Sequence, residues 1–467
     1  MKSLLFTTSL LLALLRPILA DEIHYCNSTV SCPDKYPCCS QSGQCGTGNY
    51  CLGNCDPRYS FSLNSCMPDP MCKDINTRFS KYSDKIVDGN TFLGNASEAD
   101  WTYIGYIMDY EDDDSLILAM PKNSGGTVLA STHSIWYGKV SAVMKTSHLA
   151  GVVTSFILYS GVQDEIDFEW VGADLDTTQT NFYWNGVLNW NNSANISTAD
   201  TYNDFHTYEI DWQEDYITWS VDGVVGRTLL RNQTYNATSG RYEFPQTPSK
   251  VDISIWPGGN ATNAPGTVAW AGGEINWDAA DIKDPGYYYA VVKEVNITCN
   301  SVPSGIKQNG TESYIYTNEN EFLAKDVAVT DKRIDLGSLL ASGEDPDSGV
   351  TKSSSSSSSK KTSSSSSKTS SDSKKSTTKE GKNDKDKKTT STSSSSGSKQ
   401  TAPTTTYAPT TPVSTKIEVT YVTSARPHTE AVNANANVKT ASGNFGSNIK
   451  TNSKFMIIVT LLLNFFV

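Results

Sequence analysis

The 467-residue sequence lacks an apolar run long enough to span a bilayer. A membrane-spanning helix needs about 20 apolar residues, whereas Leu10–Leu15 has six and Phe455–Val467 has thirteen. We therefore expect 1–20 to be a secretory signal peptide. The terminal apolar tail follows a polar stretch and small residues, which predicts that 445–467 is a glycosylphosphatidylinositol attachment signal. The lipid is expected on Asn444 or on one of the three residues before it, with the protein at the outer face of the plasma membrane.

The body of the chain also lacks positive charge. The net charge is −12, and residues 351–400 carry twelve lysines against four acids, so this tract contributes +8 and the remainder −20. An exported acidic body favours a neutral or weakly charged polymer as partner and argues against nucleic acid. Aromatic residues nearly vanish after about residue 335. The Ser/Thr/Lys-rich segment 335–444 is therefore predicted to be a disordered, O-glycosylated stalk.

Cysteine is almost confined to one segment. Nine of the ten cysteines lie between Cys26 and Cys72, and the tenth is Cys299. In an exported chain these residues are expected to form disulfides, so residues 24–65 are predicted to be a small cysteine-rich module. The density of Asn-x-Ser/Thr sequons predicts N-glycosylation, at Asn27, Asn95, Asn191, Asn195, Asn232, Asn236, Asn260, Asn296 and Asn309.

Residues 66–334 show no helical period longer than two turns. Short alternating or apolar runs with turn residues between them predict strands, at 138–145, 151–159, 209–212, 216–221 and 251–256. The Asp222-Gly223 pair between Val221 and Val224 predicts a hairpin, because both positions tolerate positive φ. The expected fold of this region is an all-β sandwich of two sheets.

One strand carries an unusual set of acids. Alternation along 165–170 places Glu165, Asp167 and Glu169 on one face, with three apolar side chains on the other. Retaining glycosidases need an ionised carboxylate as nucleophile and a protonated carboxyl group as acid/base, about 5–5.5 Å apart. The two glutamates are roughly 13 Å apart at Cα but could lean over the central aspartate. A polar sheet face or a calcium site remains an alternative on spacing alone.

The motif Glu165-Ile-Asp-Phe-Glu169 resembles the Glu-x-Asp-x-Glu signature of glycoside hydrolase family 16. Its context resembles the fungal Crh group of chitin–glucan cross-linking transglycosylases, with matching segments at 137–140, 151–156, 170–172, 205–212, 221–223, 255–259 and 270–273. The resemblance implies a β-jelly-roll, with Glu165 as nucleophile, Glu169 as acid/base and Asp167 as assisting carboxylate. It also implies chitin as donor and β-1,6- or β-1,3-glucan as acceptor. We expect no cofactor and no metal.

A cleft for sugar rings is expected to contain aromatic side chains, although an aromatic residue in a β-sandwich is more often part of the core. We expect Trp212 and Trp219 in the core, and a structural role for His206. The candidate sugar contacts are Phe182, Tyr183, Trp184, Trp256 and Trp270.

The cysteine-rich module resembles the hevein-type chitin-binding fold through its Cys38-Cys39-Ser40 and Gly43-x-Cys45-Gly46 pattern. Ser40 and Tyr50 occupy sugar-contact positions of that family, but Ser42 and Gln44 replace two aromatic residues. The resemblance implies three disulfides, Cys26–Cys39, Cys32–Cys45 and Cys38–Cys51. We further expect Cys66–Cys72, with a Cys55–Cys299 bridge left over. The module is expected either to bind chitin or to serve as a structural cap.

Three functions compete at this level. A wall-remodelling transglycosylase is favoured. The alternatives are a plain chitinase or β-glucanase, and a carbohydrate-binding mannoprotein without activity.

Overall fold

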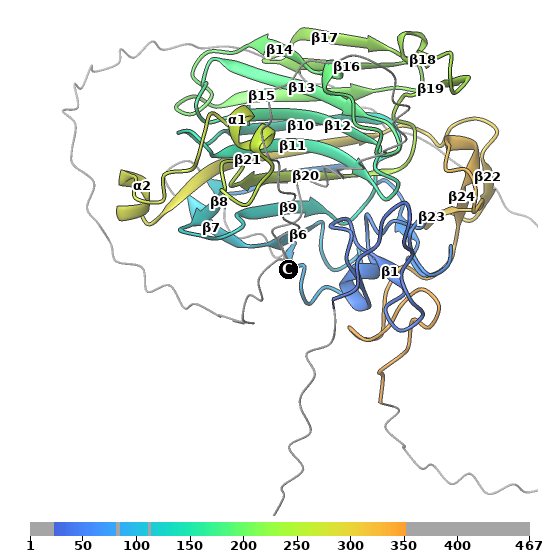
Figure 1. Ribbon diagram of the computed structural model, residues 1–467. Helices are drawn as coiled ribbons and strands as arrows, with labels where there is room; N and C mark the ends of the chain where they lie inside the picture. Colours follow the sequence, from blue (N-terminus) through green and yellow to red (C-terminus); the bar gives the residue numbers. More distant parts are fainter. Residues whose placement is uncertain (1–22, 81–84, 111–113, 352–467) are drawn as a thin grey trace, which may run out of the picture. The chain divides into compact units, whose positions relative to one another are not determined.

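The computed structural model describes residues 23–80, 85–110 and 114–351 (Figure 1). The predicted signal peptide, the predicted anchor signal and the stalk beyond residue 351 lie outside these residues. Within the described part of the chain, no helix combines the length and apolar character needed to cross a membrane.

The first large sheet has eight strands. Seven follow the order β17-β16-β15-β10-β21-β8-β7, and β4 pairs with β21 beside that path. All the pairings within this sheet are antiparallel. The bounds are β4 Ile75–Arg78, β7 Tyr106–Tyr110, β8 Ser115–Pro121, β10 Gly138–Lys145, β15 His206–Trp212, β16 Tyr216–Val221, β17 Val224–Leu230 and β21 Tyr287–Cys299.

The second large sheet also has eight strands, in the order β14-β13-β12-β11-β20-β9-β6-β5. Its pairs are antiparallel except β5–β6, which is parallel. The bounds are β5 Ile86–Asp88, β6 Trp101–Ile104, β9 Thr127–Ser131, β11 Val153–Ser160, β12 Glu165–Val171, β13 Thr177–Tyr183, β14 Ala194–Ser197 and β20 Ser249–Trp256.

The remaining elements are short. A four-stranded sheet has the order β22-β24-β23-β3, and two further pairs are β1-β2 and β18-β19. The strands are β1 Cys38–Cys39, β2 Cys45–Gly46, β3 Asp69–Pro70, β18 Tyr235–Asn236, β19 Arg241–Tyr242, β22 Lys307–Asn309, β23 Ser313–Tyr316 and β24 Val327–Thr330. The helices are α1 Pro265–Trp270 and α2 Ala280–Lys283, with 3-10 turns η1 Gly48–Cys51, η3 Trp190–Asn192, η4 Arg231–Thr234 and η5 Ala324–Asp326.

The two large sheets lie face to face and enclose one apolar core (Figure 1). Aromatic side chains join the layers. Trp170 of β12 meets Tyr208 of β15 edge to face, with ring centroids 4.5 Å apart. Such pairs contribute about 0.5–1.5 kcal/mol beyond the area they bury. Trp212 and Trp219 are fully buried. The prediction of an all-β, two-sheet sandwich of jelly-roll type is confirmed, including the core position of these two tryptophans.

The strand predictions agree closely with the structure. Strands β10 and β16 have the predicted bounds, and the other three predicted runs overlap β11, β15 and β20. The hairpin between β16 and β17 turns at Asp222 and Gly223, whose φ values are 50° and 78°. Positive φ at both central residues is the requirement that made this pair a turn signal.

Three predicted disulfides are present, Cys26–Cys39, Cys32–Cys45 and Cys38–Cys51. The prediction for the other four cysteines was wrong. The structure joins Cys55 to Cys66 and Cys72 to Cys299. The reason is strand pairing: β4 pairs antiparallel with β21, so the residues before β4 lie beside the end of β21. The Cys72–Cys299 disulfide therefore links the segment before β4 to the end of β21.

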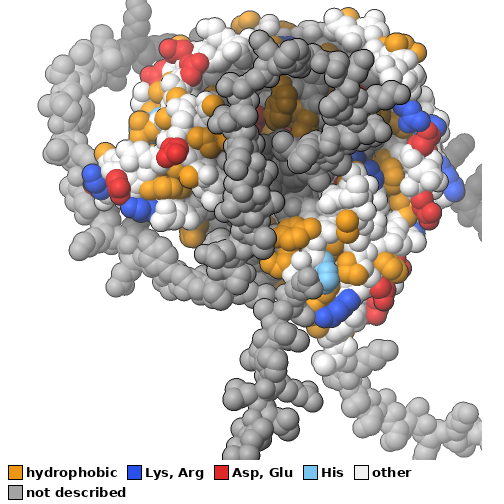
Figure 2. Space-filling model, in the orientation of Figure 1, with side chains coloured by type: hydrophobic (Ala, Val, Ile, Leu, Met, Phe, Trp, Pro, Cys, Tyr) orange, Lys and Arg blue, Asp and Glu red, His pale blue; other side chains and the backbone are white. Residues whose placement is uncertain are grey.

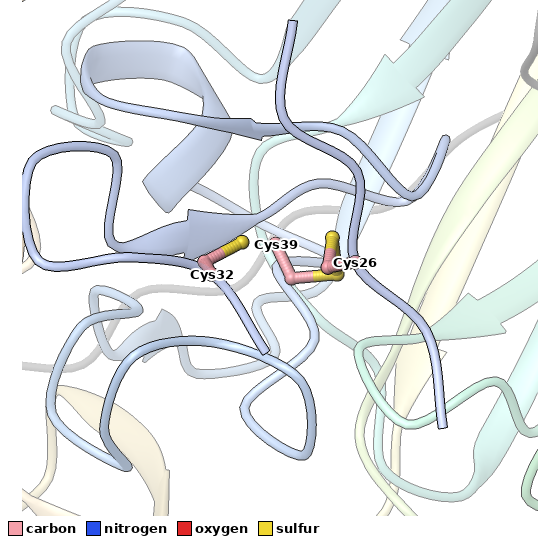
Figure 3. Close-up of side chains that lie close together, drawn as sticks. All are labelled: Cys26, Cys32 and Cys39. Atoms are coloured by element: carbon pink, nitrogen blue, oxygen red, sulfur yellow. A yellow bond between two sulfur atoms is a disulfide. The ribbon is translucent and has the colours of Figure 1, made fainter. Parts of the chain in front are cut away.

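The sulfur atoms of Cys26, Cys32 and Cys39 lie together in the cysteine-rich module (Figure 3). Three such atoms could in principle hold a metal ion. Here each is already used, because Cys26 bonds Cys39 and Cys32 bonds Cys45. A thiolate is required for metal binding, so this cluster is a pair of disulfides.

The predicted start of the stalk at residue 335 was also wrong. Residues 335–351 are described and pack against the cysteine-rich module. The Gly48 amide donates to the Ala341 carbonyl at 2.7 Å, and the Leu336 amide donates to Leu93 at 2.7 Å. Leu336 and Ala341 are buried with Cys38, Cys51, Cys55 and Met67. Two apolar side chains in a polar segment thus complete the core of a module too small to build one alone.

Candidate active site

Strand β12 carries the three acids into the second sheet. Ile166, Phe168 and Trp170 point into the core. Because side chains alternate along a strand, Glu165, Asp167 and Glu169 share the opposite face of the sheet. Asp167 is 1% exposed, and the two glutamates are half-buried. The alternation predicted from the sequence is therefore present, and all three acids belong to one surface.

Neighbouring strands supply the surroundings of the acids. Across the β12–β13 pair, Glu165 faces Tyr183, Asp167 faces Asn181 and Glu169 faces Gln179. On the other side, Tyr159 and Ser155 of β11 face Glu165 and Glu169. One strand further, Asp252 and Ser254 of β20 lie on the same face. Amides, hydroxyls, two phenols and the carboxyl group of Asp252 therefore surround the row, which suits binding of sugar hydroxyls.

Burial raises the pKa of all three acids, and the charge of Asp167 adds to this effect at both glutamates. Burial raises the pKa of Glu165 well above its usual value, and the charge of Asp167 acts in the same direction. Burial raises the pKa of Glu169 in the same way, followed by the charge of Asp167. Burial raises the pKa of Asp167 to about 7, against a hydrogen bond from Glu165 and the charge of Arg227. Differences in burial and in neighbouring charge are what can assign one carboxyl group as acid and another as base.

The carboxyl group of Asp167 has that of Glu165 as its hydrogen-bonding neighbour. Among the described residues, no amide, hydroxyl or cation donates to its two buried oxygens. The Glu165 carboxyl group is close enough for a hydrogen bond, which lowers the pKa of Asp167. The Asp167 backbone is held separately, because Trp219 donates its indole N–H to the Asp167 carbonyl at 3.0 Å. Asp167 is thus fixed in place while its carboxyl group depends on a neighbouring acid.

The five candidate aromatic residues separate into two groups. Tyr183 faces the acids, and their charges raise its pKa together with burial, which is the largest cause. Trp256 lies on the same face beyond Ser254, and Trp270 of α1 stacks on it with centroids 6.0 Å apart. Trp270 also donates to Gln179 at 2.8 Å, beside Glu169. These three residues remain candidates for sugar contact.

The other two aromatic residues lie elsewhere. Phe182 pairs with Ile166 and belongs to the core cluster, on the side of the sheet opposite the acids. It also lines a cavity of about 500 Å³, and its role as a sugar contact stays a prediction. Trp184 lines this cavity too. Asn191 and Asn236, both predicted glycosylation sites, line the same cavity. Trp184 therefore does not belong to the row of acids.

The predicted contacts of the cysteine-rich module are partly enclosed. Ser40 Oγ lies 2.9 Å from Ser42 Oγ and accepts the Gln44 amide at 3.2 Å. The ring of Tyr50 packs on Gly46, where an added Cβ would meet it at 2.5 Å.

None of the nine sequon asparagines is buried. Glycosylation at these positions stays a prediction.

Sequence reasoning missed three residues of this surface. Asp252 was detectable, because polar and apolar side chains alternate along 251–256 and put it on the face of Trp256. Tyr159 gave no such signal, since β11 is buried along its whole length. Predicting Gln179 would have required knowledge of the β12–β13 register.

His206, expected to be structural, bonds Asp222 at 2.7 Å and the Ala199 carbonyl at 2.8 Å.

In the face shown in Figure 2, acidic and basic side chains lie mostly near the margin of the described surface.

Residues 95–272 match the family model described as glycosyl hydrolases family 16. The chain is 68% identical over 329 residues to Congo red hypersensitive protein 2 of Saccharomyces cerevisiae, covering 70% of each chain. It is 51% identical to Crh-like protein 2 of Aspergillus fumigatus, covering 70% of this chain and 74% of that one. A solved structure named apo Crh5 transglycosylase aligns with a TM-score of 0.48 and 28% identity, covering 59% of this chain and 100% of that one.

The class of enzyme follows from the fold and the acid row together, which are those of a retaining glycosidase or transglycosylase. The chain belongs to the Crh-like proteins of glycosyl hydrolases family 16.

Proposed function

We propose that this protein is a cell-wall transglycosylase that cleaves chitin with retention and transfers it to β-glucan. The row of Glu165, Asp167 and Glu169 carries the proposal, because it supplies the two carboxyl groups that a double displacement needs. Its family membership supports the substrate class. A relative named as a transglycosylase has been solved in complex with N-acetylglucosamine, the sugar unit of chitin.

In the first step, a carboxylate oxygen of Glu165 attacks the anomeric carbon of the donor. The bond to the glycosidic oxygen breaks, and Glu169 transfers its proton to that oxygen. The product is an ester between the sugar and Glu165. The raised pKa of Glu169 supports its role, because the group must still hold a proton near neutral pH.

Asp167 prepares the nucleophile. Burial raises the pKa of both Asp167 and Glu165, and a hydrogen bond from Glu165 lowers that of Asp167, so we propose that the pair holds one proton. When that proton stays on Asp167, Glu165 is ionised and can attack. When Asp167 takes up the proton, the negative charge lies on Glu165, the reacting group, and no second charge lies beside it.

In the second step, the Glu169 carboxylate removes a proton from a hydroxyl group of the glucan. The resulting oxygen attacks the anomeric carbon and displaces Glu165 from the ester, which restores the free enzyme. Water in place of the glucan would give hydrolysis. The polar row of Gln179, Asn181 and Ser254 beside the acids supports binding of a sugar acceptor.

The location is part of the proposal. The amino-terminal apolar segment and the carboxy-terminal signal support secretion and a lipid anchor on Asn444, at the wall and the outer face of the plasma membrane. The stalk would then separate the enzyme from the membrane.

The test incubates the purified protein with chitin oligomers and a fluorescent β-glucan oligomer. A fluorescent product enlarged by chitin units supports transfer, whereas shortened chitin with unchanged glucan indicates a hydrolase. Glu165→Gln should lower both reactions by about a thousandfold or more, because it removes the nucleophile. Activity equal to the wild type in this variant would overturn the assignment of Glu165. Asp278→Asn, at an exposed acid, is the matched control.

A further inference from the structure

Resting on the function proposed above, a further inference concerns Arg58 of the cysteine-rich module. This side chain is 9% exposed and pairs with the nearly buried Asp56 at 2.7 Å. Two of its nitrogens bond the Asp56 carboxylate in a fork. Although burial opposes its charge, Asp56 raises the pKa of Arg58. The guanidinium is therefore fixed and charged, as a planar fork on a carboxylate should be.

The remaining nitrogen of the Arg58 guanidinium, Nη1, contacts the catalytic sandwich. Arg58 Nη1 donates to the Asn185 carbonyl at 2.9 Å and also to the Asn185 side-chain oxygen. Asn185 has φ of 52° and follows Tyr183 and Trp184 in the turn after β13. The module thus forms hydrogen bonds to Asn185, whose backbone lies in the left-handed region. A non-glycine residue in that region needs support from its surroundings.

That turn holds the residue before the nucleophile. The Asn185 amide donates to Asp164 Oδ1 at 2.8 Å. The other oxygen of Asp164 accepts from the Gln246 amide, the Thr247 amide and the Thr247 hydroxyl, at 2.8, 3.0 and 2.7 Å. An unbroken chain of hydrogen bonds therefore runs from Asp56 through Arg58 and Asn185 to Asp164, which directly precedes Glu165.

A second line of contact reaches the same end of the acid row. Tyr159 is paired with Glu165, and its buried phenol lies within the electrostatic reach of Glu165, Arg58 and Asp252. Burial raises the pKa of Asp252 to about 7, while the charge of Lys250 and, to a smaller extent, Gln41 of the module lower it. Tyr159 and Asp252, two groups on the acid-bearing face, thus have neighbours in the module.

Close packing shows that the module is seated against the sandwich. A Cβ added at Gly161, in the turn between β11 and β12, would lie 2.6 Å from the Cys55 carbonyl oxygen. Gly53 lies directly against the buried side chain of Lys250, the β20 residue that pairs with Tyr159. Contacts this close leave no room for a module that moves freely.

We propose that Arg58 is a positioning residue for the nucleophile Glu165, and that the cysteine-rich module forms a wall of the active site. The module acts on cleavage itself, through the Asn185 turn and Tyr159, whether or not it also binds chitin. This role differs from that of a tethered binding unit, which would raise the local concentration of enzyme on chitin and leave the chemical step unchanged.

The experiment compares Arg58→Met, Arg58→Lys and Asn185→Gly in the full chain, on short soluble chitin oligomers. Asn185→Gly keeps the positive φ and the backbone contacts but removes the side-chain oxygen. Arg78→Met is the matched control, because Arg78 is an exposed arginine paired with Glu294. Activity is expressed per folded molecule, measured by near-ultraviolet circular dichroism, and binding to insoluble chitin is measured by pelleting.

We expect Arg58→Met to lower kcat by about tenfold to a hundredfold, with KM within about threefold, since a misplaced reacting group costs rate more than binding. Arg58→Lys should recover part of the loss, and Asn185→Gly should lower kcat by a smaller factor. Wild-type kcat in both Arg58→Met and Asn185→Gly, or a loss of pelleting alone, would overturn the proposal.

Donor cleavage and transfer are scored separately in the wild type. A wild type that cleaves chitin without transfer would overturn the proposed transfer but still test Arg58 on cleavage. A wild type that transfers, with kcat unchanged by the substitutions at Arg58 and Asn185, would overturn only the role of Arg58.

Discussion

Asp167→Asn should make the folded protein more stable at neutral pH while it removes most of the activity. The Asp167 side chain is 1% exposed, and burial raises its pKa from 3.8 to about 7. Asparagine has nearly the same shape and no charge. The substitution therefore removes the unfavourable burial of a carboxylate and leaves the packing of β12 unchanged.

The sign of the pH dependence follows from proton binding. A carboxyl group with a raised pKa in the folded state holds its proton more tightly when folded than when unfolded. Its contribution to stability is present at low pH and is lost as the pH rises through about 7. The shift from 3.8 to about 7 is about three units, and at 1.36 kcal/mol per unit this is about 4 kcal/mol. The wild type should lose roughly this amount between about pH 4 and pH 7 through this group.

The assay is urea unfolding at several pH values, followed by tryptophan fluorescence. The free energy of unfolding of Asp167→Asn should exceed that of the wild type by a margin that grows with pH up to neutrality. Asp278→Asn serves as control, because Asp278 has a side chain that is 83% exposed. A margin that is absent, negative or constant with pH would refute the reasoning about the buried acids. Activity should fall about a hundredfold, as expected for a general acid–base partner.

Two further predictions concern the new disulfides and the aromatic platform. In the chain-entropy account, the Cys72–Cys299 disulfide closes a 227-residue separation and should add about 5 kcal/mol to the free energy of unfolding, against about 3 kcal/mol for the 11-residue separation of Cys55–Cys66. Replacing each cysteine pair by alanine and measuring urea unfolding gives both contributions. A Cys66–Cys72 peptide in a non-reducing digest would contradict the pairing. Trp270→Ala should raise KM for the donor up to about tenfold with little change in kcat, because a stacked ring is worth up to about 1.5 kcal/mol; an unchanged KM would exclude Trp270 from the sugar site.

The sequence predicted the acid row because the pattern is local. Alternation along β12 decides which side chains share a face, and no partner strand has to be known. The same holds for the hairpin at Asp222 and Gly223, where two adjacent residues determine the turn.

Features that depend on distant pairing could not be predicted. Cys72 meets Cys299 only because β4 pairs with β21. Phe182 and Tyr183 are adjacent aromatic residues with opposite orientations, and the β12–β13 register decides which of them faces the acids. The segment 335–351 looked like part of the stalk, since its burial depends on the apolar surface of a module some 290 residues away in the sequence.

The acid row and the residue before it show opposite ways of burying a carboxyl group. Asp164 is fully buried and accepts four hydrogen bonds, from Asn185, Gln246 and Thr247. These bonds oppose the effect of burial on its pKa. Asp167 is equally buried but receives no such donors among the described residues. A carboxyl group satisfied by four donors is rigid and inert, whereas one that lacks them exchanges protons with its neighbours.

This contrast explains why the start of β12 needs outside support. Glu165 is held between a firmly bonded Asp164 and an Asp167 whose charge repels it. Repulsion within the row favours any movement that separates the acids, and such movement would destroy the geometry of a double displacement. The restraint comes from the Asn185 turn and, through Arg58, from the disulfide-bonded module. A module fastened at this position would hold the start of β12 against that repulsion.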